Sequence, residues 1–278
     1  MAVSVSQRVA SRASGPSFAA LTMAADLVRH RSLVLALLER ELKARYRGSI
    51  LGFVWTFLNP LLLMAVYALV FRFYMRIAVA NYALFLLAGL LPWTWFSSSL
   101  ADGTNAIVGG SSLVTKSLFP TEILPVVVVL SNMVNFALSI PLLALAGWAY
   151  GVSFSPLAWL WLVPVMVLQC VFTLGLVLSL AALNVHYRDV QHVVANLLLL
   201  WFFLTPIVYP ASQVPERLHL LLWANPVALF TEIYRDIFVT PAWPNLEAFG
   251  VLTIYALVSI LVGAKIFDGY RDTYPELV

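Results

Sequence analysis

Six long stretches of the chain contain no Asp, Glu, Lys, Arg or His. A helix needs about 20 mostly apolar residues to cross the hydrocarbon core of a bilayer. Backbone groups find no water there, so a helix is the default conformation of such a stretch. The pattern predicts an all-α polytopic membrane protein with six transmembrane helices. They are expected near residues 50–71, 82–101, 123–150, 157–183, 193–209 and 248–264.

The composition supports this prediction. Of 278 residues, 62% are hydrophobic and 10% are charged, whereas a soluble domain carries about 25% charged residues. The length suits one membrane domain, over residues 26–278. Residues 1–25 are rich in Ala and Ser and lack the apolar run of a secretory signal, which predicts a disordered cytoplasmic tail.

The Lys and Arg residues predict the orientation. With the N-terminus in the cytoplasm, 12 of them fall on the cytoplasmic side and 4 on the other. Cytoplasmic loops carry the excess of Lys and Arg, so both termini are expected in the cytoplasm. In bacteria, the membrane concerned would be the inner membrane.

Residues 26–47 are too charged to span the membrane but have helical periodicity. We expect a helix that lies in the cytoplasmic interface with its basic side toward lipid headgroups. The alternative is an ordinary positively charged flank of the first span. The basic residues assigned to this side are Arg40, Lys43, Arg45 and Arg47.

Two loops on the expected cytoplasmic side carry candidate chemistry. The sequence SSLVTKSLF at 111–119 fits a short helix that docks a soluble partner, and a plain solvated loop is the alternative. The segment 184–192 contains His186 and His192, but no third strong ligand accompanies them. We therefore expect no metal site, and assign Arg188 and Asp189 to fixing a helix end.

Six prolines divide residues 206–247 into pieces too short to cross the membrane. Two of these pieces have a helical pattern, with apolar faces and a few charges. Non-helical backbone at membrane depth needs protein or a water-filled cavity around it. The region is therefore predicted to hold two short re-entrant helices at the outer mouth of a pathway.

Four blocks of the sequence resemble, in order, a known family. They are RELKARYRGSILGFVWTFLNPLL at 40–62, SLVTKSLFPTEILP at 112–125, LNVHYRDV with TPIVYP at 183–190 and 205–210, and NPVALFTEIYRD at 225–236. Together they are similar to the membrane subunit of ABC-type polysaccharide exporters, which includes O-antigen, teichoic acid and capsule permeases.

The resemblance implies a permease that forms half of a homodimer, binds a separate ATPase subunit and exports a lipid-linked polysaccharide. The ATPase subunit would bind ATP and Mg²⁺. No cofactor, metal or nucleic acid is expected on this chain. The implied ATPase contacts are Ser112, Leu113, Lys116, Phe119 and Glu122. The implied outer gate residues are Glu216, Arg217, Glu232, Arg235 and Asp236.

Aromatic residues of the first and fifth stretches are candidates for the cargo path, because aromatic faces pack against the C–H faces of sugar rings. Trp and Tyr also gather at membrane interfaces, and Phe packs against lipid, so those roles stay open for each residue. The candidates are Trp55, Phe57, Tyr67, Trp201, Phe202 and Tyr209.

Other functions fit the sequence less well. The chain lacks a GxxxxGK[ST] phosphate loop, so its energy must come from a partner or an ion gradient. An ion-coupled secondary transporter usually keeps ionisable groups inside the membrane, and the six stretches have none. A membrane enzyme would need a clustered acid, base or metal site. Export of a small lipid or drug by the same kind of permease remains an alternative.

Overall fold

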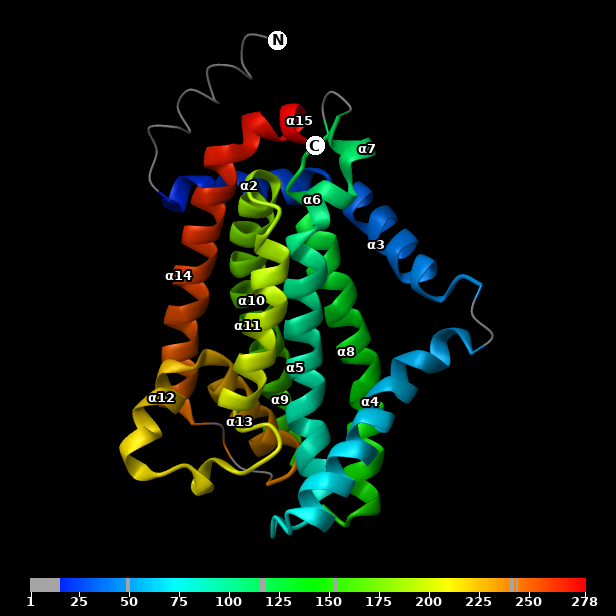
Figure 1. The fold of residues 1–278 in the computed structure, drawn as a ribbon, viewed down its shortest axis with the longest axis vertical. Coiled ribbons are helices and arrows are strands. Elements are labelled where there is room, and N and C mark those ends of the chain that lie inside the picture. The colour runs from blue at the N-terminus through cyan, green and yellow to red at the C-terminus, as the bar shows by residue number, and fades with distance from the viewer. Residues whose placement is uncertain (1–15, 49–50, 116–118, 153–154, 241–242, 244) are drawn as a thin grey trace.

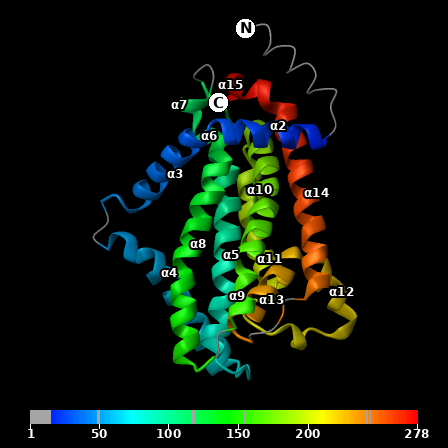
Figure 2. The same ribbon diagram turned by 180° about the vertical axis from the view of Figure 1, so that it is seen from behind.

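The computed structural model describes residues 16–48, 51–115, 119–152, 155–240, 243 and 245–278. Over these residues the chain is helical and contains no strand, as the sequence predicts. Long helices run roughly side by side, and shorter ones close both ends of the bundle (Figure 1, Figure 2). The predicted all-α membrane fold is confirmed.

Five helical segments of the described chain are long and apolar enough to cross a membrane. The first joins α4 (Trp55–Tyr67) to a π-helical turn η2 (Ala68–Tyr74), and the fourth joins α9 (Pro156–Leu160) to α10 (Leu162–His186). The others are α5 (Tyr82–Thr104), α8 (Ile123–Ala149) and α14 (Leu246–Tyr270), which continues into η5 (Arg271–Thr273).

The fifth predicted span is shorter than expected. It forms α11 (Val190–Leu204), whereas the apolar stretch extends to residue 209. Thr205 adopts an extended backbone, with ψ at 132°, because the ring of a following proline disfavours helical geometry in the residue before it. Pro206 therefore ends the helix, and at 1.5 Å per residue α11 is about 22 Å long.

α5 lies in the middle of the bundle and packs against α4, α8, α10, α11 and α13. α10 and α14 form the other extensive contact, and two glycines allow their backbones to touch. A Cβ atom on Gly263 would lie 2.1 Å from the carbonyl oxygen of Gly175. Small residues at such contacts are typical of helix packing in membranes.

One end of the bundle, here called the terminal face, is formed by α2 (Pro16–Arg29), α6 (Ala106–Gly109), α7 (Ser111–Val114) and α15 (Tyr274–Leu277) (Figure 1). Ala19 and Met23 of α2 are buried against the bundle. The prediction of a disordered tail is therefore wrong for residues 16–25, since apolar contacts order them; residues 1–15 lie outside the described residues.

α3 (Arg31–Tyr46) follows α2 after a break at His30 and slopes away from the terminal face. The single interfacial helix expected over 26–47 is thus two helices. Val34 and Leu37 of α3 are buried in a cluster with residues of α8. After the turn η1 (Gly52–Val54), α4 runs back across α5 and α8 (Figure 2).

The opposite face is formed by α9, η3 (Ala211–Gln213), η4 (Glu216–Leu218), α12 (His219–Ala224) and α13 (Pro226–Phe238). α13 begins where its sequence predicts: the side chain of Asn225 accepts hydrogen bonds from Val227 N and Ala228 N, and Pro226 occupies the first helical position. The two short helices expected in this region are confirmed, and α13 is almost wholly buried against the bundle.

Candidate functional site at the junction of α3, α4, α5 and α8

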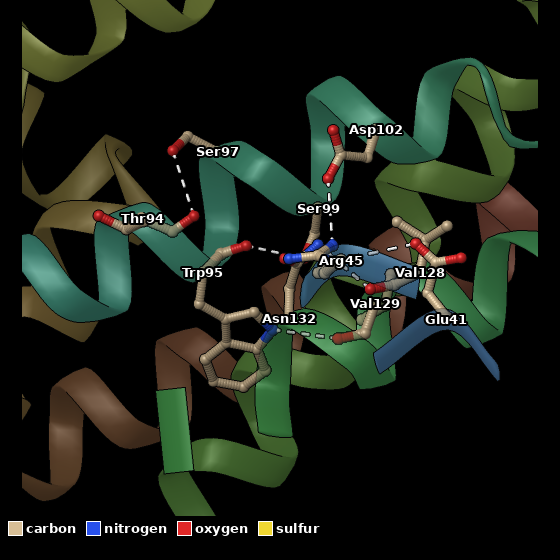
Figure 3. Close-up of polar contacts among 10 residues, drawn as sticks. All are labelled: Glu41, Arg45, Thr94, Trp95, Ser97, Ser99, Asp102, Val128, Val129 and Asn132. Carbon is tan, nitrogen blue, oxygen red and sulfur yellow. Dashed lines mark hydrogen bonds and ion pairs between the residues drawn. The ribbon is translucent and has the colours of Figure 1, made fainter. Parts of the chain in front are cut away.

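Arg45 of α3 joins two membrane-spanning helices. Its Nη1 donates to Oδ1 of Asn132 on α8 at 2.9 Å, and its Nη2 lies 3.3 Å from Oδ2 of Asp102 on α5. Glu41, one helical turn earlier, lies 3.9 Å from its Nε. Figure 3 shows the guanidinium group between these three partners. Asn132 is buried, whereas the Asp102 side chain is 53% exposed, so the Arg45 side chain lies at the edge of the bundle, and its expected role at lipid headgroups stays a prediction.

The partners of Arg45 are themselves held in place. Nδ2 of Asn132 donates to the carbonyl oxygen of Val128 at 3.2 Å, which leaves Oδ1 facing the arginine. The indole of Trp95 donates to the carbonyl oxygen of Val129 at 3.3 Å and links α5 to α8 at the same level (Figure 3). The Trp95 ring stacks on Phe136, with centroids 5.4 Å apart. These contacts connect α3, α5 and α8.

A pocket of about 510 Å³ opens beside this network, between the end of α3, the start of α4, and the middle of α5 and α8. Its volume lies within the range of small-molecule sites, about 300–1,000 Å³. Seven of the thirteen lining residues are polar but uncharged, and three are aromatic. The lining residues are Arg45, Trp55, Thr56, Asn59, Pro60, Leu91, Thr94, Trp95, Ser98, Asn132, Asn135, Phe136 and Ser139.

Uncharged polar residues within the apolar stretches indicate this pocket, although the distribution of charged residues does not. Asn132, Asn135 and Ser139 are spaced i, i+3 and i+7, which places them on one face of α8. Thr94 and Ser98 of α5 share a face in the same way. A polar face inside an apolar helix indicates a site within the bundle. The sequence gives no sign, however, that these faces meet Arg45.

The comparison with known proteins identifies the family. The model of the ABC-2 type transporter family matches residues 32–239. The chain belongs to the ABC-2 type transporter family. It is 44% identical to the O-antigen export system permease protein RfbA of Myxococcus xanthus over 91% of this chain and 98% of that protein. The RfbA permease of Klebsiella pneumoniae is 31% identical over 88% and 95%, and the polysialic acid transport protein KpsM of Escherichia coli 24% over 84% and 92%.

Members of the ABC-2 family are transport components, and this chain is a multi-pass membrane protein of that kind.

The expected ATPase contacts divide into exposed and buried positions. Ser112 is exposed on α7, Leu113 is half-buried there, and Lys116 lies outside the described residues. Phe119 packs beside Ile123 in an apolar cluster with α3. Ser112 and Leu113 alone among the described candidates lie on a short helix at the terminal face.

Glu122 is not a surface contact in this ABC-2 chain, so that expectation is wrong. It is 1% exposed, and both of its carboxylate oxygens lie 3.0 Å from Nη2 of Arg271. The pair ties the start of α8 to the end of α14 across 149 residues of sequence. Burial raises the pKa of the Glu122 carboxyl above its ordinary value of 4.5, while the Arg271 guanidinium partly opposes the rise.

The raised pKa predicts a pH dependence of stability. A carboxyl that binds its proton more tightly in the folded state favours folding below its unfolded pKa and loses that contribution as pH rises through its folded pKa. We expect the melting temperature of the wild type to fall relative to Glu122→Gln as pH rises from about 4 to about 8. Thermal unfolding in detergent measures this, with Glu276→Gln, at an exposed position of α15, as the control. If the melting temperature of the wild type instead rises relative to that of Glu122→Gln as pH increases, the attraction of Arg271 outweighs the effect of burial on the Glu122 carboxyl.

The remaining interface-helix residues are exposed as well. Arg40 and Arg47 lie on the surface of α3 and at its end, and Lys43 pairs with Glu39 one turn earlier. Their role at lipid headgroups stays a prediction. In the 184–192 segment, the His186 ring packs on Tyr270 with centroids 4.4 Å apart. The described residues contain no group of three or more His, Cys, Asp or Glu that could hold a metal ion.

The aromatic candidates do not form one continuous lining in the single chain. Trp55 is 38% exposed and lines the pocket, and Phe57 is half-buried in α4. Tyr67 stacks on Phe202 with centroids 5.6 Å apart, and Trp93 meets the same ring edge-on. Phe202 is consequently 6% exposed, so it supports the packing of α4, α5 and α11 and is not the open lining residue expected.

The two other aromatic candidates brace the opposite face. The Trp201 indole donates to Oδ1 of Asn225 at 2.8 Å, and Asn225 in turn donates to the Thr205 hydroxyl at 2.9 Å. The Tyr209 hydroxyl donates to the carbonyl oxygen of Phe203 at 2.9 Å. These bonds fix the turn after α11 against the start of α13. A role for either ring along a cargo path stays a prediction.

The five gate candidates occupy different environments. Glu216 and Arg217 are exposed on η4, and Asp236 is half-buried. Glu232 is partly exposed and accepts a 2.7 Å hydrogen bond from Arg235, whose side chain is 5% exposed. Arg235 is therefore part of the packed bundle, and a gating role for this group of residues stays a prediction.

Proposed function

We propose that this chain is the permease subunit of an ATP-driven exporter that moves a lipid-linked polysaccharide, such as O-antigen, across a bacterial inner membrane. Two copies would frame the path, and a separate subunit would bind ATP and Mg²⁺. The observation that carries the proposal is the similarity to an O-antigen export permease, which extends over 91% of this chain and 98% of that protein. The polar and aromatic pocket beside the candidate spans that contain α4, α5 and α8 agrees with a sugar-containing cargo.

The proposal places the ATPase at the terminal face, on the cytoplasmic side. Ser112 and Thr115 are exposed there on α7 and just after it, while Val114 is buried with Phe267 and Tyr274. α7 therefore presents polar side chains outward and is anchored inward to α14 and the C-terminal segment. Because interiors are close-packed and transmit strain, a push on α7 would be passed to the spans.

We predict that Ser112→Arg combined with Thr115→Arg lowers recovery of the co-expressed ATPase by about tenfold or more in affinity purification, the equivalent of losing about 1.4 kcal/mol. Both positions are exposed, so the chain itself is expected to fold. Gln213→Arg, which adds the same side chain at an exposed position on the opposite face, is the control. Unchanged ATPase recovery and export with the double variant would place the ATPase contact elsewhere.

The function itself is tested by deletion of the gene and by transport in proteoliposomes. Deletion is expected to abolish surface polysaccharide and to leave lipid-linked polymer on the cytoplasmic side. Purified permease with its ATPase is expected to move that polymer only when ATP is hydrolysed. Intact surface polysaccharide after deletion, or equal transport by the permease alone, would contradict the proposal.

A further inference from the structure

We infer that the pocket between α3, α4, α5 and α8 is a carbohydrate subsite, which binds an uncharged sugar ring of the cargo and not the phosphate of its lipid anchor. The inference rests on the proposed function and adds to it a location and a ligand chemistry. It depends on three properties of the pocket: its unused polar groups, its charge and its aromatic wall.

The first property is the presence of polar side chains that have no hydrogen-bond partner among the described residues. Asn59 is exposed on the membrane-spanning helix α4, and its side-chain amide makes no hydrogen bond to another residue within the described chain. The Ser98 hydroxyl on α5 likewise lacks a partner among the described residues. Polar side chains at membrane depth are costly unless something binds them. Both groups face the same pocket, where ring hydroxyls of a sugar would satisfy them.

The second property is the charge balance. Arg45 is the one charged residue that lines the pocket. Its guanidinium is already bound by Asn132 and Asp102, with Glu41 at 3.9 Å. The arginine and these two carboxylates together carry a net charge of −1. The two carboxylates do not line the pocket, but they offset the guanidinium charge, so a phosphate gains no net attraction there, whereas a neutral hydroxyl can still accept a hydrogen bond from Arg45. The charge balance therefore favours a sugar over an anion.

The third property is an aromatic wall. Trp55 is 38% exposed at the start of α4 and supplies the accessible ring of the pocket, while the lining residues Trp95 and Phe136 are buried and stack on one another behind it. Flat rings beside hydrogen-bonding groups suit a sugar, since its C–H faces pack on aromatic rings and its hydroxyls point to the edges. Binding of this kind tolerates successive residues of a polymer.

The test uses the exporter purified with its ATPase in lipid nanodiscs. Two photoreactive lipids are compared, both with a diazirine on the first isoprenoid unit: phytanyl diphosphate carrying N-acetylglucosamine, and phytanyl diphosphate without a sugar. Mass spectrometry locates the labelled residues. We expect labelling around the pocket to be about tenfold stronger with the sugar-bearing lipid, the equivalent of about 1.4 kcal/mol. Equal labelling by both lipids would overturn the inference in favour of an anchor or phosphate site.

Three variants test the assigned groups. Asn59→Leu and Ser98→Val each remove a polar group that has no internal partner, so no buried group is left unsatisfied, and each is expected to lower labelling by the sugar-bearing lipid by about tenfold. Trp55→Ala is expected to lower it similarly, and Trp55→Phe to retain most of it. Thr253→Val, a polar-to-apolar change on α14 away from the pocket, is the control. Undiminished labelling of all three would overturn the inference.

ATP-driven export, measured with the same preparation, separates this inference from the proposed function. Wild-type protein that prefers the sugar-bearing lipid but does not export polysaccharide would contradict the function and leave the subsite standing. Export without any preference between the two lipids would overturn the subsite alone. Loss of both preference and export in Asn59→Leu, with the control unaffected, would support the two together.

Discussion

Replacing Gly263 by Ala is expected to prevent stable folding of the bundle. The added Cβ would lie 2.1 Å from the carbonyl oxygen of Gly175. On the facing helix, Gly175→Ala would place a Cβ 2.3 Å from the carbonyl carbon of Ser259. The clashing atoms belong to the backbone, so no change of rotamer relieves them and α10 and α14 must separate. Overpacking costs about 1–3 kcal/mol when side chains can yield, and we expect at least the upper value here.

A matched control exists on the same helix. A Cβ on Gly250 would meet open space, and Ala is the better helix former by about 1 kcal/mol in water. We therefore expect Gly250→Ala to be neutral or slightly stabilising, and Gly263→Ala to reduce monodisperse protein and its melting temperature in detergent. The hydrogen bond from the Ser259 hydroxyl to the Phe172 carbonyl, 2.8 Å long, would be lost in the same separation. Equal stability of the two variants would show that α10 and α14 do not touch at this point.

Replacing Arg235 by Met is expected to loosen the turn between α11 and α13. The Arg235 side chain donates to Glu232 at 2.7 Å and to the carbonyl oxygen of Ile207 at 2.9 Å, and its Cζ lies 3.6 Å from the centre of the Phe85 ring. Methionine preserves much of the volume but none of these interactions. Removing the charge also removes its desolvation cost, which offsets part of the loss.

The balance still favours destabilisation. The Ile207 carbonyl would lose a charged donor in a buried position, at a cost of about 1–3 kcal/mol, and the desolvated cation–π contact contributes about 2 kcal/mol. We expect a net loss of about 2 kcal/mol and faster hydrogen exchange at the amides of Ile207 and Val208. The Tyr82 hydroxyl bond to the Val208 carbonyl, at 2.8 Å, limits the opening.

Arg217→Met serves as the control for Arg235→Met, because Arg217 is exposed on η4. Surface substitutions usually change stability by less than about 0.5 kcal/mol. Unchanged exchange at Ile207 in Arg235→Met would show that the turn is held by its other bonds alone. We expect Arg235→Lys to lose less stability than Arg235→Met and more than Arg217→Met. An ammonium group cannot reach the Glu232 carboxylate and the Ile207 carbonyl in the planar geometry of a guanidinium.

Local chemistry explains which features of the fold could be anticipated. The uncharged stretches identify the spans because lipid excludes charges and unpaired backbone groups. Proline and asparagine signals locate helix ends, as at Asn225 and Pro226, which begin α13. Hydropathy extends the fifth span to residue 209, five residues beyond the end of α11, whereas the restriction that Pro206 places on Thr205 ends the helix at Leu204.

The site residues were harder to anticipate, because a charged side chain near a membrane interface has two possible destinations. Arg40 and Arg45 lie on the same amphipathic segment and both are exposed, yet the Arg45 side chain also bonds to α5 and α8. Glu122 could equally have met a soluble partner, and is instead buried on Arg271. Local spacing cannot distinguish these outcomes, since both satisfy the same periodicity.

The membrane-spanning segments, the interrupted region after α11 and the resemblance to exporter permeases can be recognised in the sequence, because each depends on residues close together in the chain. The contacts of Arg45 with Asp102 and Asn132, 57 and 87 residues away, and the pocket that polar faces of α5 and α8 border with α4, become visible in the folded chain. The physical reason is that these contacts depend on how helices cross. Such crossings are set by packing along the entire bundle, including the glycine contact of α10 with α14.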